Sequence, residues 1–389
     1  MGILQGTTTA GPALLRGVDL KPHKTIGIAV SGDVLLNKLE IEIIDTPQFQ
    51  RLRRIKQLGT AYLVYPTAVQ SRFDHSIGTL SMACRMMRAI EENEHNEKDE
   101  RSISNEEKQF IRLLALLHDI THIPFGHTIE DEAHVLERHD ENDTRMDRFV
   151  GEGSRIGAII IKHLGQDLYS RFWQIFSCKK KEVSGLADDA FMYDIVNNTI
   201  CADLLDYIKR DSYFCNLELD TAYRFLKYLY IGRIKSPSSR RVMIRLWKGA
   251  EKRPRKDLLS EMVRLLDNRY FLAERVYFHH AKLASSAMIG RAMQSALRSN
   301  EVTESSLCEI GDEELLCKLR ESRQSDAKAI GTALLNRELW KEIDQFSTED
   351  VLHAPHRDPG QIHLDHRLLH RALPPALPDD CAQPTQNES

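Results

Sequence analysis

The residues best suited to chemistry stand at the end of an apolar helical segment. The stretch LLALLHDITHIPFGH at 113–127 runs into His118 and Asp119, followed by His122 and His127. Neighbouring His and Asp side chains reach one ion where a helix ends, because irregular backbone relaxes their separation of about 100° around the helix. The pattern predicts half of a metal site at His118 and Asp119.

Two further ligands are needed, and several side chains are candidates. They include His75 in SRFDHSIGT and Asp203 in NTICADLLDYIKRD. Helical spacing favours Asp203, because Asp203, Tyr207, Arg210 and Asp211 fall on one face of a helix while the remaining positions are mostly apolar. We expect this face to line a pocket.

A ligand set of two His and two Asp leaves coordination positions open for water and substrate. Mixed nitrogen and oxygen ligands suit Mn, Fe, Mg, Ni or Zn without choosing among them. Such an ion lowers the pKa of bound water and neutralises phosphate oxygens, which is the usual route to hydrolysis of a phosphate ester. We therefore expect one divalent metal of unresolved identity.

The elements that must position these residues are mainly helical. Ser104 and Glu107 form a capping box that predicts a helix from about 105 to His118 and Asp119, broken by Pro124 and Gly126. Further helices are predicted at 187–213 and at 257–298, the second stretch being either one helix or a divided one. A hairpin is predicted within 24–44 and a short strand at 240–248. The expected fold is mainly α, with a small α+β lobe.

Composition narrows the class of protein. The 389 residues are 42 % hydrophobic and carry a net charge of −4, which fits a globular protein without strong, indiscriminate nucleic-acid binding. The seven cysteines are scattered and include no C-x-x-C pair, which is typical of reduced thiols in the cytoplasm. The sequence also shows no signal peptide and no run of 18 apolar residues, so we expect a cytoplasmic protein with no membrane partner. From Asp350 onward, six of the thirteen prolines and no aromatic residue predict a flexible tail.

The chemistry-bearing motifs form an ordered series that resembles a known family, the HD superfamily. Within it they are most similar to the deoxynucleoside triphosphate triphosphohydrolases, which include antiviral members with a sterile-alpha-motif. The motifs are IIDTPQFQRLRRIKQLG (43–59), SRFDHSIGT (71–79), LLHDITHIPFGHTIE (116–130), CADLLDYIKRD (201–211) and NRYFLAERVY (268–277). The resemblance covers roughly 24–290 and implies an HD-domain helical fold that assembles into homo-oligomers, either dimers or tetramers. It also implies in-line attack on the α-phosphorus, which releases deoxynucleoside and triphosphate.

The resemblance also implies a role for each motif residue. The metal ligands would be His75, His118, Asp119 and Asp203. The catalytic pocket would hold His122, His127, His139 and Glu130, with Glu130 orienting His127 for protonation of the leaving oxygen. Substrate contacts would come from Gln57, Leu58, Arg72, Tyr207, Asp211, Arg269 and Tyr277.

Regulation is a further implication of the resemblance. Asp45, Gln50 and Arg53 match residues that hold an activating guanine nucleotide between subunits. The alternative is structural: Asp45 caps the helix that begins at Pro47, and Arg53 makes an ion pair. Both interpretations stay open on the sequence.

Departures from the family pattern leave rival functions open. Leu204 stands where the antiviral enzymes have a phosphate-binding lysine, and Ala273 and Phe278 replace a histidine and a glutamine. The rivals are a nucleotidase or other phosphohydrolase acting on a different phosphate ester, and a nucleotide-binding sensor with a structural HD centre. A nuclease is a third, because residues 240–256 are basic, although a solvated surface is favoured there. An antiviral role by nucleotide depletion is consistent with the resemblance.

Domain boundaries follow from the same patterns. We expect a flexible N-terminus, a phosphohydrolase domain that includes the basic lobe near 216–256, a C-terminal helical subdomain and a flexible tail. Their ranges are 1–23, 24–290, 291–349 and 350–389.

Overall fold

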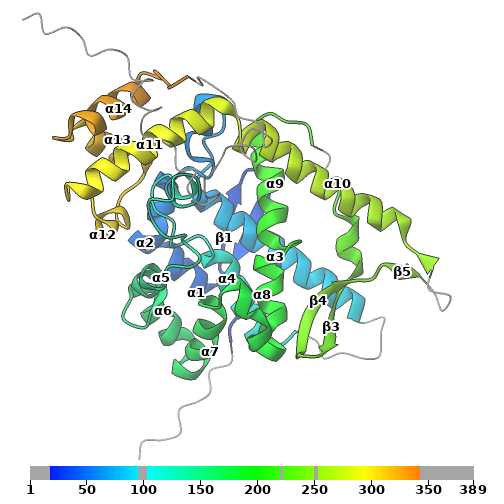
Figure 1. Ribbon diagram of the computed structural model, residues 1–389. Helices are drawn as coiled ribbons and strands as arrows, with labels where there is room; N and C mark the ends of the chain where they lie inside the picture. The colour runs from blue at the N-terminus through cyan, green and yellow to red at the C-terminus, as the bar shows by residue number, and fades with distance from the viewer. Residues whose placement is uncertain (1–17, 95–102, 220–221, 249–252, 342–389) are drawn as a thin grey trace, which may run out of the picture.

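The chain folds into a mainly α-helical protein with small antiparallel strand pairs, as the sequence predicts (Figure 1). The computed structural model describes residues 18–94, 103–219, 222–248 and 253–341. The expected tail at 350–389 and most of the expected flexible N-terminus lie outside the described residues. None of the helices in the described ranges is both long and apolar enough to cross a membrane.

The α-helices are α1 Lys38–Ile44, α2 Pro47–Gln50, α3 Arg72–Glu94, α4 Asn105–Leu117, α5 Asp143–Val150, α6 Arg155–Leu164, α7 Gln166–Phe176, α8 Ala190–Asn197, α9 Ala202–Phe214, α10 Lys256–Leu272, α11 His280–Arg298, α12 Glu304–Leu307, α13 Asp312–Arg320 and α14 Ser325–Leu335. The 3-10 and π-helical segments are η1 Arg51–Arg54, η2 Gly59–Leu63, η3 Thr128–Glu132, η4 Lys180–Asp189, η5 Arg224–Tyr228 and η6 Ala273–Tyr277. The strands are β1 Lys24–Ile28, β2 Gly32–Leu36, β3 Leu229–Lys235, β4 Ser238–Ile244, β5 Trp247–Lys248 and β6 Arg253–Pro254.

Helix α3 is the centre of the fold, because it packs against both α4 and α9. Leu80 and Met86 of α3, Leu114 of α4 and Ile208 of α9 are all buried. Removing such side chains from water is the main favourable contribution to folding, at roughly 25 cal/mol per Å² of apolar surface. The same packing brings together three segments that carry predicted metal ligands.

Helix α4 confirms the prediction made from its capping box. Ser104 Oγ accepts from the backbone N–H of Glu107 at 3.2 Å, and Glu107 Oε2 accepts from the backbone N–H of Ser104 at 2.7 Å. The helix ends at Leu117, so His118 and Asp119 follow it directly. Local sequence therefore fixes where this half of the site begins.

The predicted helix at 187–213 is in fact two helices. Between α8 and α9 the chain is extended, with φ −106° and ψ −176° at Asn198 and φ −145° and ψ 172° at Cys201. Helical periodicity alone does not reveal such a break, because apolar positions continue across it. The break has a consequence for chemistry, since it puts Asp203 in the first turn of α9.

The predicted segments at 257–298 and 24–44 are also subdivided. The first contains α10, the π-helical turn η6 and α11. The second forms the antiparallel pair β1–β2, with Ile26 opposite Val34, and then α1, which Asn37 caps. The strand predicted at 240–248 lies in the lobe, where β4 pairs with β3 with Leu229 opposite Ile244, and β5 pairs with β6. This lobe lies beside α10 in Figure 1.

One buried carboxyl group connects helix α13 to the loop that follows α4. Asp312 accepts from the backbone N–H of Phe125 at 2.9 Å and from that of Lys56 at 2.8 Å. Burial raises the pKa of Asp312 to about 6, although both N–H groups oppose this. The domain boundary expected at 290/291 falls inside α11, and the division into domains stays a prediction.

Candidate active site

Three predicted metal ligands converge at the junction of α3, α4 and α9. His75 Nε2 lies 3.1 Å from His118 Nε2 and 3.0 Å from Asp203 Oδ1, and His118 Nε2 lies 3.8 Å from the same oxygen. These three side chains form a group whose donor atoms could hold a metal ion. Two ligand atoms about 2.1 Å from an ion lie about 3.0 Å apart at 90° and about 3.4 Å apart in a tetrahedron. The observed spacings therefore suit a shared ion.

Hydrogen bonds on the far side of each ring orient the two histidines. His118 Nδ1 faces the carbonyl oxygen of Ala115 at 2.9 Å, and His75 Nδ1 faces Asp206 Oδ2 at 2.9 Å. The Ala115 carbonyl and the Asp206 carboxylate only accept hydrogen bonds, so each Nδ1 carries a hydrogen. The Nε2 atom of each ring then points toward the other ring and is available to a metal ion. Such support from outside the ligand set is what metal-binding histidines have in proteins.

The carboxylates around His75 favour a positive charge at the place between these donors. Burial by itself lowers the pKa of His75, but the carboxylates of Asp203, Asp206 and Asp119 outweigh it and raise the pKa to about 10. A bound cation satisfies the same carboxylates, so metal and proton compete for one position. The donor set fits a divalent ion on this ground as well as by geometry.

Asp119, the fourth predicted ligand, lies at the edge of this group. Its Oδ1 is 3.5 Å from His118 Nε2, and its Oδ2 accepts from Arg72 Nη1 at 2.6 Å. Burial favours the neutral acid, yet His118, Arg72 and His122 together hold the pKa of Asp119 well below its usual value. Asp119 is thus a carboxylate, with one oxygen on Arg72 and the other turned toward the donors.

The structure corrects the predicted position of Arg210. We expected its guanidinium in the pocket, but Arg210 is fully buried behind His75, where its Nε donates to Asp206 Oδ2 at 2.8 Å and its Nη1 to the Ala29 carbonyl at 3.0 Å. Gly78 of α3 makes room, since a Cβ there would collide with Asp206 and Arg210. Sequence reasoning missed Asp206, although its position three residues after Asp203 was a usable signal.

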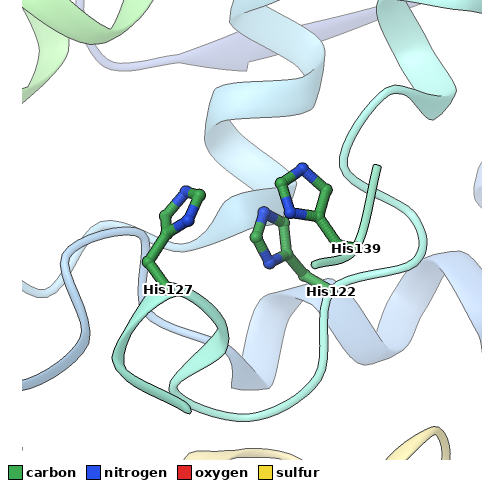
Figure 2. Close-up of side chains that lie close together, drawn as sticks. All are labelled: His122, His127 and His139. Atoms are coloured by element: carbon green, nitrogen blue, oxygen red, sulfur yellow. The ribbon is translucent and has the colours of Figure 1, made fainter. Parts of the chain in front are cut away.

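A second group joins the three predicted pocket histidines, His122, His127 and His139, which Figure 2 shows close together. The rings of His122 and His139 stack with centroids 3.6 Å apart, and the ring of His127 stands edge-on to both, 4.8 Å from His122 and 5.4 Å from His139. His122 Nε2 lies 3.4 Å from Asp119 Oδ1, so this group adjoins the metal donors.

The carboxylate partners in this group differ from the expected arrangement. We expected Glu130 to orient His127, but Asp131 Oδ2 lies 2.6 Å from His127 Nδ1. Glu130 instead contacts His139 Nδ1 at 3.2 Å and Arg145 Nη1 at 2.5 Å. Helix geometry allows either carboxylate, because Asp131 is four residues and Glu130 three residues from His127, and the turn η3 decides between them.

His122 and Glu130 occupy opposite electrostatic environments. Burial, Arg72 and His139 keep the pKa of His122 well below its usual value, and neither ring nitrogen has a hydrogen-bond partner in the described part of the chain. Burial favours a neutral Glu130, but His139 and Arg145 lower its pKa. His122 is therefore a neutral ring and Glu130 a carboxylate at neutral pH.

A cavity of about 810 Å³ opens onto the metal donors. Its walls include ten of the predicted site residues: Gln57, Arg72, His75, His118, Asp119, His127, His139, Asp203, Tyr207 and Arg269. The described lining does not include Leu58, His122, Glu130, Asp211 and Tyr277. Ligand pockets in proteins span roughly 300–1,000 Å³, so the cavity is large enough for a nucleotide.

The buried Asp211 pairs with the partly buried Tyr277 next to Tyr207. Tyr277 donates its hydroxyl to Asp211 Oδ2 at 2.8 Å, and the Gln70 side-chain amide donates to Asp211 Oδ1 at 2.9 Å. The rings of Tyr207 and Tyr277 meet edge-to-face with centroids 6.5 Å apart. Burial raises the pKa of Asp211 to about 6. This arrangement supports the cavity wall from behind.

The residues predicted for an activating nucleotide form local contacts. Gln50 donates to the Ile44 carbonyl at 2.8 Å and accepts from Arg53 Nε at 2.9 Å, and the Arg53 guanidinium stacks 3.5 Å from the Phe73 ring centroid. Thr46, rather than Asp45, caps α2, because its side chain accepts from the backbone N–H of Phe49. Asp45 is exposed at the end of α1, so the alternative of Asp45 as a cap is wrong.

Three departures from the family pattern are also placed. Leu204 is buried, Phe278 is exposed, and Ala273 begins the turn η6. None of them supplies a charge to the cavity.

Comparison with known proteins agrees with this geometry. Residues 72–210 match the model of the HD domain, and residues 262–363 match that of the HD associated region. The chain is also similar to a crystal structure of a hypothetical protein from Aquifex aeolicus, with a TM-score of 0.63, 23 % identity, and coverage of 82 % of this chain and 76 % of that one. At this identity the likeness concerns the fold alone.

Curated relatives include enzymes of named activity. The chain is 30 % identical to the deoxynucleoside triphosphate triphosphohydrolase SAMHD1 of Danio rerio, over 57 % of this chain and 38 % of that protein. A SAMHD1 homolog of Dictyostelium discoideum is 27 % identical over 85 % of this chain and 62 % of its own. An uncharacterized protein of Methanocaldococcus jannaschii is 29 % identical over 84 % and 61 %. The chain thus spans less than two thirds of the length of these relatives.

Proposed function

Because residues 72–210 of this chain match the HD domain, we propose that it is a metal-dependent phosphohydrolase that cleaves deoxynucleoside triphosphates into deoxynucleoside and triphosphate. The family match and the donor set support the general class, a hydrolase of the HD phosphohydrolase type. The substrate and the bond cleaved are the part that we propose.

The observation that carries the proposal is the meeting of two histidine Nε2 atoms and a carboxylate oxygen at the wall of a cavity, with a second group of histidines beside them. When bound, a divalent ion at such donors activates water and neutralises phosphate oxygens. His75, His118 and Asp203 would hold the ion, with Asp119 as the fourth ligand. The open cavity leaves room for the substrate phosphate next to them.

Arg72 is suited to binding a phosphate oxygen. It is almost completely buried, so solvent screens its charge poorly, and its Nε has no hydrogen-bond partner among the described residues. The hydrogen bond from Nη1 to Asp119 fixes the guanidinium beside the metal donors. In this role Arg72 positions the phosphate for attack.

His127 is the residue best placed to protonate the leaving 5′-oxygen. Its side chain is 47 % exposed at the cavity, and Asp131 accepts from Nδ1, which leaves Nε2 to carry and release a proton. The neutral His122 and the Glu130-bound His139 pack against it and keep its ring in place. Gln57, Tyr207 and Arg269 line the space in which the sugar, base and phosphates would lie.

A product assay tests the proposal. Purified protein is incubated with Mn²⁺ and, separately, with deoxynucleoside triphosphates, ribonucleoside triphosphates and nucleoside monophosphates, and the products are separated by ion-exchange chromatography. We expect deoxynucleoside and intact triphosphate. His118→Ala should lose activity and bound metal, whereas His163→Ala, at a histidine that pairs with Glu42, should keep both. Release of inorganic phosphate or monophosphate without triphosphate would refute the proposed substrate reaction.

One observation favours a second candidate, a nucleotidase or other phosphohydrolase that cleaves a different phosphate ester. Leu204 is buried, so the α9 position after Asp203 contributes no cation to the cavity. Loss of one charged hydrogen bond to phosphate costs about 1.5–3 kcal/mol unless another cation replaces it. Cleavage of a monophosphate but of no triphosphate in the same assay would support this candidate.

Assembly and regulation are further proposals, and they follow from the motif resemblance. We expect homo-oligomers, either dimers or tetramers, and activation by a nucleotide at Asp45, Gln50 and Arg53. Size-exclusion chromatography with light scattering, with and without nucleotide, measures the oligomeric state, and a rate assay with added GTP measures activation.

A further inference from the structure

The cavity continues from the metal donors to a wall formed by Arg138 and by three consecutive lysines, Lys179, Lys180 and Lys181. Two of these cations already have carboxylate partners. Arg138 lies 3.1 Å from Asp131 Oδ1 and 3.0 Å from Asp140 Oδ1. Lys179 Nζ lies 2.6 Å from Asp143 Oδ1 and donates to the Glu141 carbonyl at 2.7 Å. Their charges are therefore largely compensated within the protein.

Lys180 and Lys181 differ from these two residues. Both are exposed at the start of η4, and neither has an ion pair or hydrogen bond within the described ranges. Two adjacent ammonium groups without carboxylate partners attract anions, and a concave wall strengthens their field. The same wall also contains Glu137, Asp140 and Glu141, of which Asp140 pairs with Arg138, so Lys180 and Lys181 are two lysines of a mixed-charge wall whose ammonium groups are available to an anion.

The metal end has limited capacity for further negative charge. Arg72 shares its guanidinium with Asp119, Arg210 is bound to Asp206, and Leu204 supplies no charge. A single phosphate group is satisfied by the metal, Arg72 and the histidines. Phosphates beyond the cleaved bond carry additional charge. Arg269 lines the same cavity and supplies one cation, and Lys180 and Lys181 are the lysines of the described cavity wall without a carboxylate partner that can neutralise the rest.

We propose that Lys180 and Lys181 bind the phosphates of the substrate that lie beyond the cleaved bond, and so determine selectivity for polyphosphate over monophosphate. The inference rests on the proposed function, because it takes a nucleoside polyphosphate as the substrate. It adds a recognition element on η4 that replaces the cation absent at Leu204.

A binding experiment tests this without turnover. Isothermal titration calorimetry measures inorganic tripolyphosphate and orthophosphate binding to the full-length, metal-free chain. The double variant Lys180→Ala/Lys181→Ala should weaken tripolyphosphate binding by about tenfold, within the limit of about thirtyfold set by two exposed ion pairs of up to about 1 kcal/mol each. It should change orthophosphate binding by less than about twofold. The matched control Lys318→Ala/Lys328→Ala removes two exposed lysines outside the cavity lining and should behave as wild type.

Three results would overturn the inference: no tripolyphosphate binding by the wild type, an equal loss in the control variant, or an equal loss for both anions. Kinetics provide a second measurement. In the lysine variant, KM for a deoxynucleoside triphosphate should rise by about tenfold while kcat is kept. If no deoxynucleoside triphosphate is hydrolysed, the proposed function fails, and the anion-binding result still decides the role of the lysines.

Discussion

Replacing Asp131 by Asn tests which carboxylate orients His127. The family resemblance assigns this role to Glu130, whereas the hydrogen bonds of the structure assign it to Asp131. Asp131 Oδ2 lies 2.6 Å from His127 Nδ1, and the two side chains are 32 % and 47 % exposed. The hydrogen bond from His127 holds the pKa of Asp131 below its usual value. A pair this exposed contributes at most about 1 kcal/mol to stability, so the free energy of unfolding should change little. Because asparagine lacks the negative charge that stabilises a protonated His127, and its amide can turn an NH2 toward the ring, kcat should fall about ten- to a hundredfold.

For Glu130→Gln we expect the reverse: a large decrease in the free energy of unfolding and a smaller decrease in kcat. The Glu130 side chain is fully buried, lies 2.5 Å from Arg145 Nη1 and contacts His139. Loss of one partner from a buried ion pair costs about 3–5 kcal/mol. Glu304 lies 3.0 Å from Arg145 Nε and glutamine keeps an acceptor oxygen, so we expect the lower end, about 3 kcal/mol. At temperatures where the variant remains folded, kcat should fall less than in Asp131→Asn.

Two measurements decide between these assignments. Urea unfolding followed by circular dichroism gives the free energy of unfolding, and chromatography of the products gives kcat across pH. If Glu130→Gln kept full stability and lost more kcat than Asp131→Asn, Glu130 would be the residue that orients His127, and the reasoning from the hydrogen bonds would be refuted.

The remaining predictions concern the metal, a buried carboxyl group and regulation. His118→Ala should reduce bound Mn²⁺, measured by elemental analysis after gel filtration, to a small fraction of that in His163→Ala; equal metal content would exclude His118 as a ligand. Burial raises the pKa of Asp211 to about 6 from 3.8, so the folded state favours the neutral acid, and the contribution of this group to stability is complete below pH 3.8 and lost as pH rises through 6. The difference in unfolding free energy between wild type and Asp211→Asn should accordingly change between pH 4 and 6, and a constant difference would contradict the assignment. Added GTP should raise turnover of a second nucleotide in wild type but not in Asp45→Ala; an identical rise in both would place activation elsewhere.

Local sequence was sufficient for much of the helical framework. The capping box at Ser104 and the apolar positions of α4 act within one helix, so their effect is readable without the rest of the fold. The division between α8 and α9 was not readable in this way, because extended backbone at Asn198 and Cys201 interrupts a segment whose hydrophobic pattern continues. The helix propensity of individual residues predicts structure poorly where tertiary packing determines the path of the chain.

The side chains available for chemistry can be read from the amino-acid sequence: His118 and Asp119 stand at a helix end, and His75 and Asp203 lie within recognisable motifs. Which of their atoms meet depends on folding, since His75 is 43 residues from His118 and 128 from Asp203. The tertiary structure also assigned Asp206 to His75 and Asp131 to His127, and buried Arg210 away from the cavity. Residue types are fixed by the chain, whereas a hydrogen bond or a ligand set depends on distances of a few ångströms that packing alone establishes.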